Sequence, residues 1–107
     1  MRDLPEATVQ PTRYVVSCLP EDHVDRHLFE IKVEYRAGRW AITRHGRCLG
    51  SDGEWDYDVN AYDQTDAWIE AHRHDIDTAL RLAKRAAACI TVNGVSVKSV
   101  LARETRR

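Results

Sequence analysis

The pattern of hydrophobic and polar residues along the chain changes character near Tyr62. Before this point, apolar and polar side chains alternate one by one, which is typical of strands that bury one face of an antiparallel sheet. The alternation is complete over residues 28–36 and returns at 54–59, where acidic and large apolar residues take turns. With a first strand over residues 13–19, this part of the chain predicts an antiparallel meander.

Two-residue turns set the register that the middle strands are expected to adopt. A turn at 37–38 places Tyr35 opposite Trp40, so that apolar residues meet apolar residues. A second turn at 45–46 continues the meander in the same way. The register and the apolar pattern therefore agree.

The turn after Leu49 allows two registers. A three-residue loop over 51–53 places Leu49 opposite Trp55, whereas a two-residue loop places it opposite Asp56; burial favours the first. The acidic residues of this strand then face away from the core: Glu54, Asp56 and Asp58. The opposite face of the sheet is predicted to be apolar and buried: Phe29, Ile31, Val33, Tyr35, Trp40, Ile42, Leu49, Trp55 and Tyr57.

Later in the chain, apolar residues recur at steps of three and four, which marks one stripe of a helix. Thr65 or Asp63 can cap a first helix, and Asp75 with Asp77 can cap a second one that ends near Ala88. Two helices with a break between them are therefore favoured over one long helix.

These elements predict an α+β fold, in which helices from residues 65–88 pack on one face of a four- or five-stranded antiparallel meander. Length and composition indicate a single domain over 13–104. Residues 1–12 contain two prolines and little periodicity, and they are expected to form a flexible N-terminal arm.

The C-terminal end allows two structures. After a short strand, an Asn93-Gly94 turn leads either to a returning strand or to a helical turn from Ser96, and the helical turn is favoured. Residues 105–107 are expected to fray.

Several segments also resemble those of a known family. The resemblance rests on the runs Asp77-Thr-Ala-Leu-Arg-Leu-Ala-Lys-Arg-Ala, Thr91-Val-Asn-Gly, Cys48-Leu and Asp52-Gly-Glu-Trp-Asp-Tyr. Over about residues 13–102, the chain is similar to small α+β proteins of actinobacteria and their phages. That family has no assigned activity, so the resemblance carries no function onto any residue here.

Charge is segregated along the chain, although the formal net charge is only −1. Residues 51–72 contain seven carboxylates and no Lys or Arg, whereas residues 73–107 contain eight Lys or Arg and three acids. Such polarity favours charged partners. We therefore expect a non-catalytic protein-interaction or regulatory module, with Glu54, Asp56 and Asp58 as its acidic interaction face.

A nucleic-acid-binding protein is the alternative. Arg81, Lys84 and Arg85 lie at steps of three and four on one face of the expected second helix, where they could contact phosphates. A solvated helix face explains the same spacing. The partner and the oligomeric state remain open at this stage.

No residue pattern in the sequence indicates a particular reaction, a metal site or a cofactor site. A calcium loop beginning at Asp56 fails, because Ala61 and Ala67 stand where Gly and Glu are required. His23 and His27 have a spacing seen in metal sites, but they fall in a connection between strands. A Gly-x-Ser-x-Gly motif is absent from the sequence. We therefore expect no catalytic residues, no bound metal and no cofactor.

The remaining polar residues favour a structural interpretation. Cys18, Cys48 and Cys89 are odd in number and far apart, and they are expected to be reduced and packed as small hydrophobes. His72 falls on the apolar stripe and is expected to be a hydrogen-bonded core residue. The sequence has no span apolar enough to cross a bilayer and no signal peptide at its start, so a cytoplasmic location without membrane partners is expected.

Overall fold

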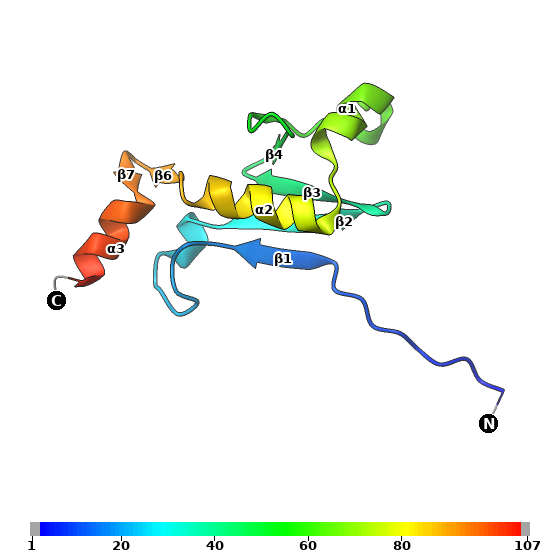
Figure 1. Cartoon of the computed structure of the whole chain (residues 1–107), viewed down its shortest axis with the longest axis horizontal. Helices are drawn as coiled ribbons and strands as arrows, with labels where there is room; N and C mark the ends of the chain where they lie inside the picture. The colour runs from blue at the N-terminus through cyan, green and yellow to red at the C-terminus, as the bar shows by residue number, and fades with distance from the viewer. Residues whose placement is uncertain (1–2, 106–107) are drawn as a thin grey trace.

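The alternating segments form one five-stranded antiparallel sheet with the strand order β1-β2-β3-β4-β5. The computed structural model describes residues 3–105, and it confirms the predicted α+β fold (Figure 1). The strands of the sheet are β1 (Arg13–Val16), β2 (Ile31–Arg36), β3 (Arg39–Arg44), β4 (Arg47–Leu49) and β5 (Trp55–Tyr57). Two predicted strands are shorter than expected, since β1 ends at Val16 and a 3₁₀ turn at Arg26–Leu28 precedes β2.

The turns produce the register that the sequence predicts. Tyr35 lies opposite Trp40 across the 37–38 turn, where Ala37 has φ +50° and Gly38 φ +88°. This left-handed pair matches the twist of the flanking strands. Leu49 of β4 lies opposite Trp55 of β5, across the loop of residues 50–54. This register brings Trp55 to the same face of the sheet as Leu49.

The helical region consists of two helices, as the second cap predicts. Thr65 caps α1 (Asp66–His72), and Asp75 caps α2 (Ile76–Ala87). Between the helices, the backbone of His74 pairs with that of Trp40 on β3. The Trp40 nitrogen lies 2.8 Å from the His74 oxygen, and the His74 nitrogen lies 2.9 Å from the Trp40 oxygen. This extended link interrupts the helical path. It also fixes α2 at the side of β3.

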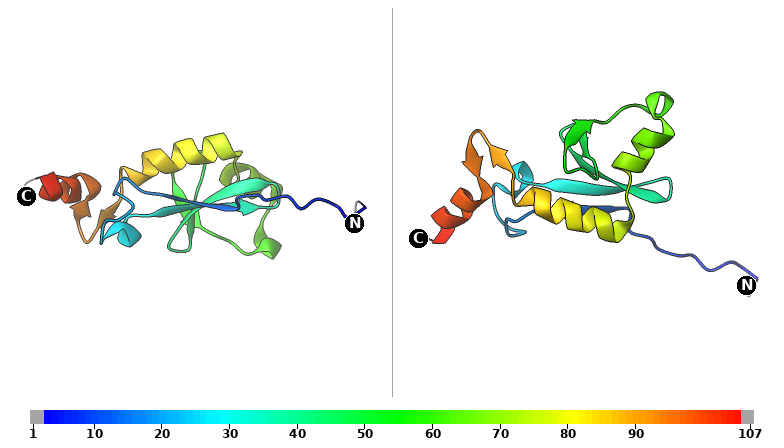
Figure 2. Two further views of the ribbon diagram at one scale, coloured as in Figure 1. Left: turned by 90° about the horizontal axis from the view of Figure 1, so that it is seen from below. Right: turned by 45° about the horizontal axis from the view of Figure 1, so that its top comes forward.

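Only the second helix covers the sheet, so the prediction that the whole region 65–88 packs on one face is wrong for α1. α2 contacts β1, β2 and β3, whereas α1 lies beside the β4–β5 hairpin (Figures 1 and 2). The backbone N–H of Ser51 donates to the carbonyl of Ala71 at 2.9 Å, which ties the end of α1 to that hairpin.

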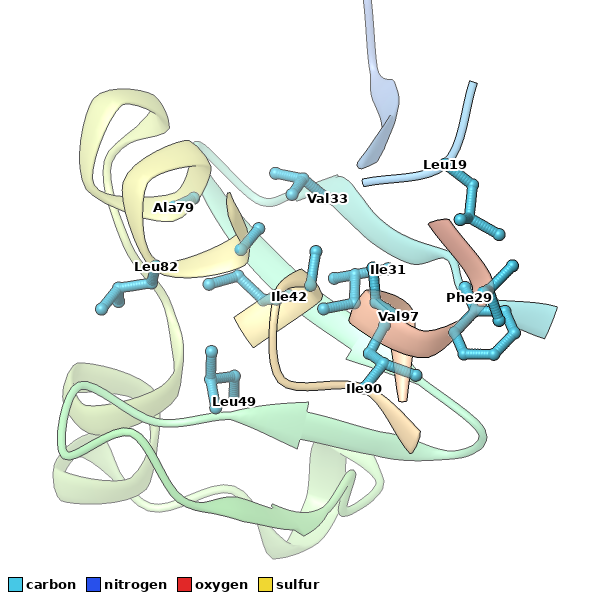
Figure 3. Packing of buried hydrophobic residues seen from close by; sticks show 13 residues of the cluster. Leu19, Phe29, Ile31, Val33, Ile42, Leu49, Ala79, Leu82, Ile90 and Val97 are labelled. Atoms are coloured by element: carbon cyan, nitrogen blue, oxygen red, sulfur yellow. The ribbon is translucent and has the colours of Figure 1, made fainter. Parts of the chain in front are cut away.

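The core lies between α2 and the sheet (Figure 3). Its buried members are Leu19, Phe29, Ile31, Val33, Ile42, Leu49, Ala79, Leu82, Ala83, Ala87, Ile90, Val97 and Val100. Trp40 and Trp55 are partly buried at its margin. Tyr57 is 73% exposed, so its predicted place in the core is wrong. β5 is an edge strand at the end of the sheet opposite to β1, beyond the strands that α2 contacts, and the Tyr57 ring lies against Arg47 instead.

The C-terminal end contains both of the structures that the sequence allowed. A small hairpin of β6 (Thr91–Val92) and β7 (Val95–Ser96) is followed directly by α3 (Val97–Thr105). The choice of a helical turn in place of a returning strand is therefore wrong in part. Of the residues expected to fray, 106 and 107 lie outside the described residues.

Replacing Asp75 with alanine is expected to destabilise the fold at neutral pH and to have progressively less effect in acid. The Asp75 carboxylate accepts hydrogen bonds from the Thr78 backbone N–H at 2.8 Å and from the Thr78 hydroxyl at 3.1 Å, and these bonds lower the pKa of Asp75. A lowered folded-state pKa stabilises the fold above the pKa of the unfolded chain, and this contribution is lost as pH falls through the folded-state value.

Urea unfolding of both proteins, from neutral pH to below pH ~4, tests this. The exposed turn residue Asp22, replaced with alanine, is the matched control. A difference between Asp75→Ala and the parent that stays constant with pH would contradict the cap assignment.

Candidate binding site

The acidic residues of β5 and its continuation are not a free, solvated row. The Asp56 carboxylate lies 2.7 Å from Nε2 of His72, and Asp58 pairs with both Arg36 and Arg73 at 3.4 Å. Within residues 3–105, only Glu54 of the three acids lacks a side-chain partner. None of the three acids belongs to the apolar core, as predicted, although Asp58 is largely buried by its ion pairs and Asp56 is half exposed.

His72 is a hydrogen-bonded core residue, as expected. Its ring stacks on Trp68 with 4.4 Å between centroids, and Nδ1 lies 2.8 Å from the Trp68 carbonyl oxygen. Both ring nitrogens thus face acceptors, the carbonyl on one side and Asp56 on the other. These two contacts fix the orientation of the ring between α1 and the β4–β5 hairpin.

Arg73 is a site residue that the sequence did not identify. Only 5% of this residue is exposed, and its guanidinium lies over the Trp68 ring, 4.8 Å from the centroid. It donates to the His72 carbonyl at 3.0 Å and to Asp58 at 3.4 Å. No local signal distinguishes it from the exposed arginines, because its burial follows from the packing of α1 against the hairpin.

Cys48 lies on the same face of the sheet as Asp56, which is its partner in the β4–β5 pairing. Burial, followed by the negative charge of Asp58, raises the pKa of the Cys48 thiol. A thiol held in its protonated form is a poor nucleophile and a poor metal ligand. Cys18 and Cys89 are exposed, so the expectation that all three cysteines are packed as small hydrophobes is wrong for these two.

The candidate metal ligands do not converge. Within residues 3–105, no group of three or more His, Cys, Asp or Glu side chains is placed to hold a metal ion. Nδ1 of His23 accepts a hydrogen bond from the backbone N–H of Asp25 at 3.0 Å, and His27 is exposed in the adjacent 3₁₀ turn. Both residues belong to the connection between β1 and β2.

The basic residues of α2 are exposed together on its solvent side. Arg81, Lys84 and Arg85 form no ion pair with any residue in the described part of the chain, whereas Ala79 and Ala83 face the core. The sequence spacing therefore correctly predicts a shared basic helix face.

An open groove of about 570 Å³ separates the C-terminal end of α2 from the β4–β5 hairpin. We call it the α2–hairpin groove. Its apolar lining consists of Leu49, Trp55, Leu82, Ala86 and Ile90, and its polar lining consists of Arg44, Ser51, Asp52, Arg85, Cys89 and Thr91. The groove thus combines an apolar floor with two cations, one of which belongs to the basic helix face.

Arg44 is the unusual member of this lining. It donates to the Leu28 carbonyl at 3.2 Å, but its Nε is buried without a hydrogen-bond partner in residues 3–105. Partial burial lowers the pKa of the Arg44 guanidinium, and no described carboxylate pairs with it. A cation that has lost water and gained no counter-charge interacts favourably with an incoming anion.

A second cavity, of about 350 Å³, is lined almost entirely by polar residues near the β3–β4 turn. Its carboxylates already have partners. Glu34 accepts from Thr43 at 3.1 Å and pairs with Arg36, and Arg36 pairs with Asp58 as well. This cavity is therefore a largely self-neutralised network.

Comparison of the chain with protein-family models, curated proteins and solved structures finds no match. The family resemblance of the sequence stays a prediction. Among the described residues, no helix has the length and apolar character needed to span a bilayer.

Proposed function

We propose that the protein is a non-catalytic interaction module that binds an acidic, extended segment of a partner protein in the α2–hairpin groove. The main support is the pairing of Arg44 and Arg85 with an apolar floor in one open groove. The acids that the sequence marked as the interaction face are mostly engaged within the molecule. The groove itself has two arginines against the single acid Asp52, so the partner that complements it is negative.

The groove suits a peptide better than a small ion. Apolar side chains of the peptide would bury against Leu49 and Leu82, while its carboxylates would face Arg44 and Arg85. Arg81 and Lys84 continue the positive charge along α2 beyond the groove, and they would accelerate association with an acidic partner at low salt.

Single-stranded nucleic acid is the second candidate, because the partly exposed Trp55 lies in the same groove as Arg44 and Arg85. An aromatic ring between cations is a common platform for base stacking and phosphate contacts. The apolar part of the lining favours a peptide with apolar side chains over a phosphodiester chain.

Binding of two labelled peptides and an oligonucleotide tests the proposal. The probes are a ten-residue peptide of alternating Glu and Leu, its Lys counterpart, and a thymidine dodecamer; the readouts are fluorescence anisotropy and the NMR signal of the Trp55 indole N–H. We expect the Glu peptide to bind, to shift the Trp55 signal, and to bind at least about tenfold more weakly to the Arg85→Glu variant. Arg103→Glu, an exposed change on α3, is the matched control and is expected to bind as the parent does.

Binding of the dodecamer alone, with a steep loss of affinity as salt rises, would replace the protein partner with nucleic acid. Equal binding of the Lys peptide, or an Arg85→Glu variant that binds the Glu peptide as well as the parent, would overturn the proposal.

A further inference from the structure

The described part of the N-terminal arm, residues 3–12, carries exposed apolar side chains that pack against no other part of the described chain. Leu4 is 68% exposed and Val9 is 97% exposed. Pro5 and Pro11 favour an extended backbone, and residues 5–12 contain no regular secondary structure. An extended backbone with exposed apolar side chains is the form in which peptides commonly bind to grooves.

The arm points away from the α2–hairpin groove of its own molecule. The backbone N–H of Tyr35 donates to the Thr12 carbonyl at 2.9 Å, which continues the β1–β2 pairing and fixes the direction in which the arm leaves. The arm departs near the N-terminal end of α2, whereas the groove lies at the C-terminal end of that helix (Figures 1 and 2). From Thr12 to Leu4 the extended chain reaches about 26 Å, which is enough to cross to a neighbouring molecule.

We propose that the arm of one copy of this chain binds in the α2–hairpin groove of a second copy. This inference rests on the proposed function and names one segment that the groove takes. Leu4 and Val9 would cover the apolar floor, and the carboxylates of Asp3 and Glu6 would face Arg44 and Arg85.

Charge supports this pairing of arm and groove. By sequence, the arm over residues 1–12 contains two acids, Asp3 and Glu6, and one basic residue, Arg2. The groove contains two arginines against the single acid Asp52. The partly buried guanidinium of Arg44 lacks a carboxylate in its own chain, and an acid from the arm would supply one. Reciprocal exchange of two arms closes a dimer, whereas one-way exchange builds longer assemblies.

A disulfide test uses Cys89, which lines the groove and is exposed. In a Cys18→Ser background, Val9→Cys is expected to form a disulfide with Cys89 on mild oxidation. Mixing ¹⁴N- and ¹⁵N-labelled chains shows by mass spectrometry whether the two cysteines come from different copies. Val24→Cys, at a largely exposed apolar position in the β1–β2 connection, is the matched control and is expected to give no such bond.

Sedimentation of the full chain, over a concentration series, is the second measurement. We expect self-association that the double change Leu4→Asn, Val9→Asn weakens at least about tenfold and that Val24→Asn leaves unchanged. A parent that stays monomeric throughout the series, a 9–89 disulfide within one copy, or association that survives the double change would each overturn the proposal. If the Glu peptide still binds in that case, the groove function stands and only its occupancy by the arm is wrong.

Discussion

Replacing Ile42 with alanine is expected to lower the free energy of unfolding by about 2 to 5 kcal/mol. Ile42 is fully buried on β3, opposite Val33, near the centre of the cluster that α2 covers (Figure 3). The smaller side chain removes apolar contacts and leaves a cavity that the surrounding strands and helix fill only partly. Since a domain of this size has about 5 to 15 kcal/mol in total, this one change removes a large share.

Urea unfolding followed by tryptophan fluorescence measures the change in stability. Val24→Ala is the control, since this residue is mostly exposed and its truncation is expected to cost less than about 0.5 kcal/mol. If Ile42→Ala were as stable as Val24→Ala, the packing of α2 on this part of the sheet would be incorrect.

Replacing Arg73 with methionine is expected to cost about 2 to 4 kcal/mol, even though methionine fills a similar volume. The guanidinium is buried against Trp68 and pairs with Asp58, whose carboxylate is also largely buried. Without Arg73, Asp58 keeps a partner in Arg36, so the expected loss is below that of a completely orphaned buried charge.

The same substitution at Arg39 is the matched control. Arg39 pairs with Glu70 at 3.0 Å on the surface, where such a pair contributes about 0.2 to 1 kcal/mol. In an Asp58→Asn background, the cost of Arg73→Met is expected to fall by about 1 kcal/mol or more, because the two side chains interact directly. Equal costs in both backgrounds would show that Arg73 acts through packing on Trp68 and not through its charge.

The Arg73 network and the proposed groove lie on different sides of the β4–β5 hairpin. Asp56 faces His72 on one side of the hairpin, and Trp55 lines the groove on the other, as expected for neighbouring residues of a strand. Variants of Arg73 are therefore expected to change stability more than ligand contacts. A peptide-binding measurement on a folded Arg73→Met variant would separate these two effects.

The local sequence was sufficient for most of the elements, for the turns between β2 and β5 and for most of the register. The 37–38 turn, the pairing of Leu49 with Trp55 and the caps at Thr65 and Asp75 are decided by a few neighbouring residues. The inner faces of β2 and β3 follow from strict alternation, which is why the burial of Ile42 could be predicted.

The tertiary structure decided what covers each face and which charges remain free. Alternation placed Tyr57 and Asp56 on opposite faces of β5 but could not show that the α2 layer ends before Tyr57, or that α1 brings His72 and Arg73 to the acidic side. The groove joins Arg44 to Arg85 across 41 positions of sequence, a distance over which local patterns carry no information. Hydrophobic periodicity determines which side of an element is buried, whereas the position of an element's neighbours determines how far that burial extends and where charges meet.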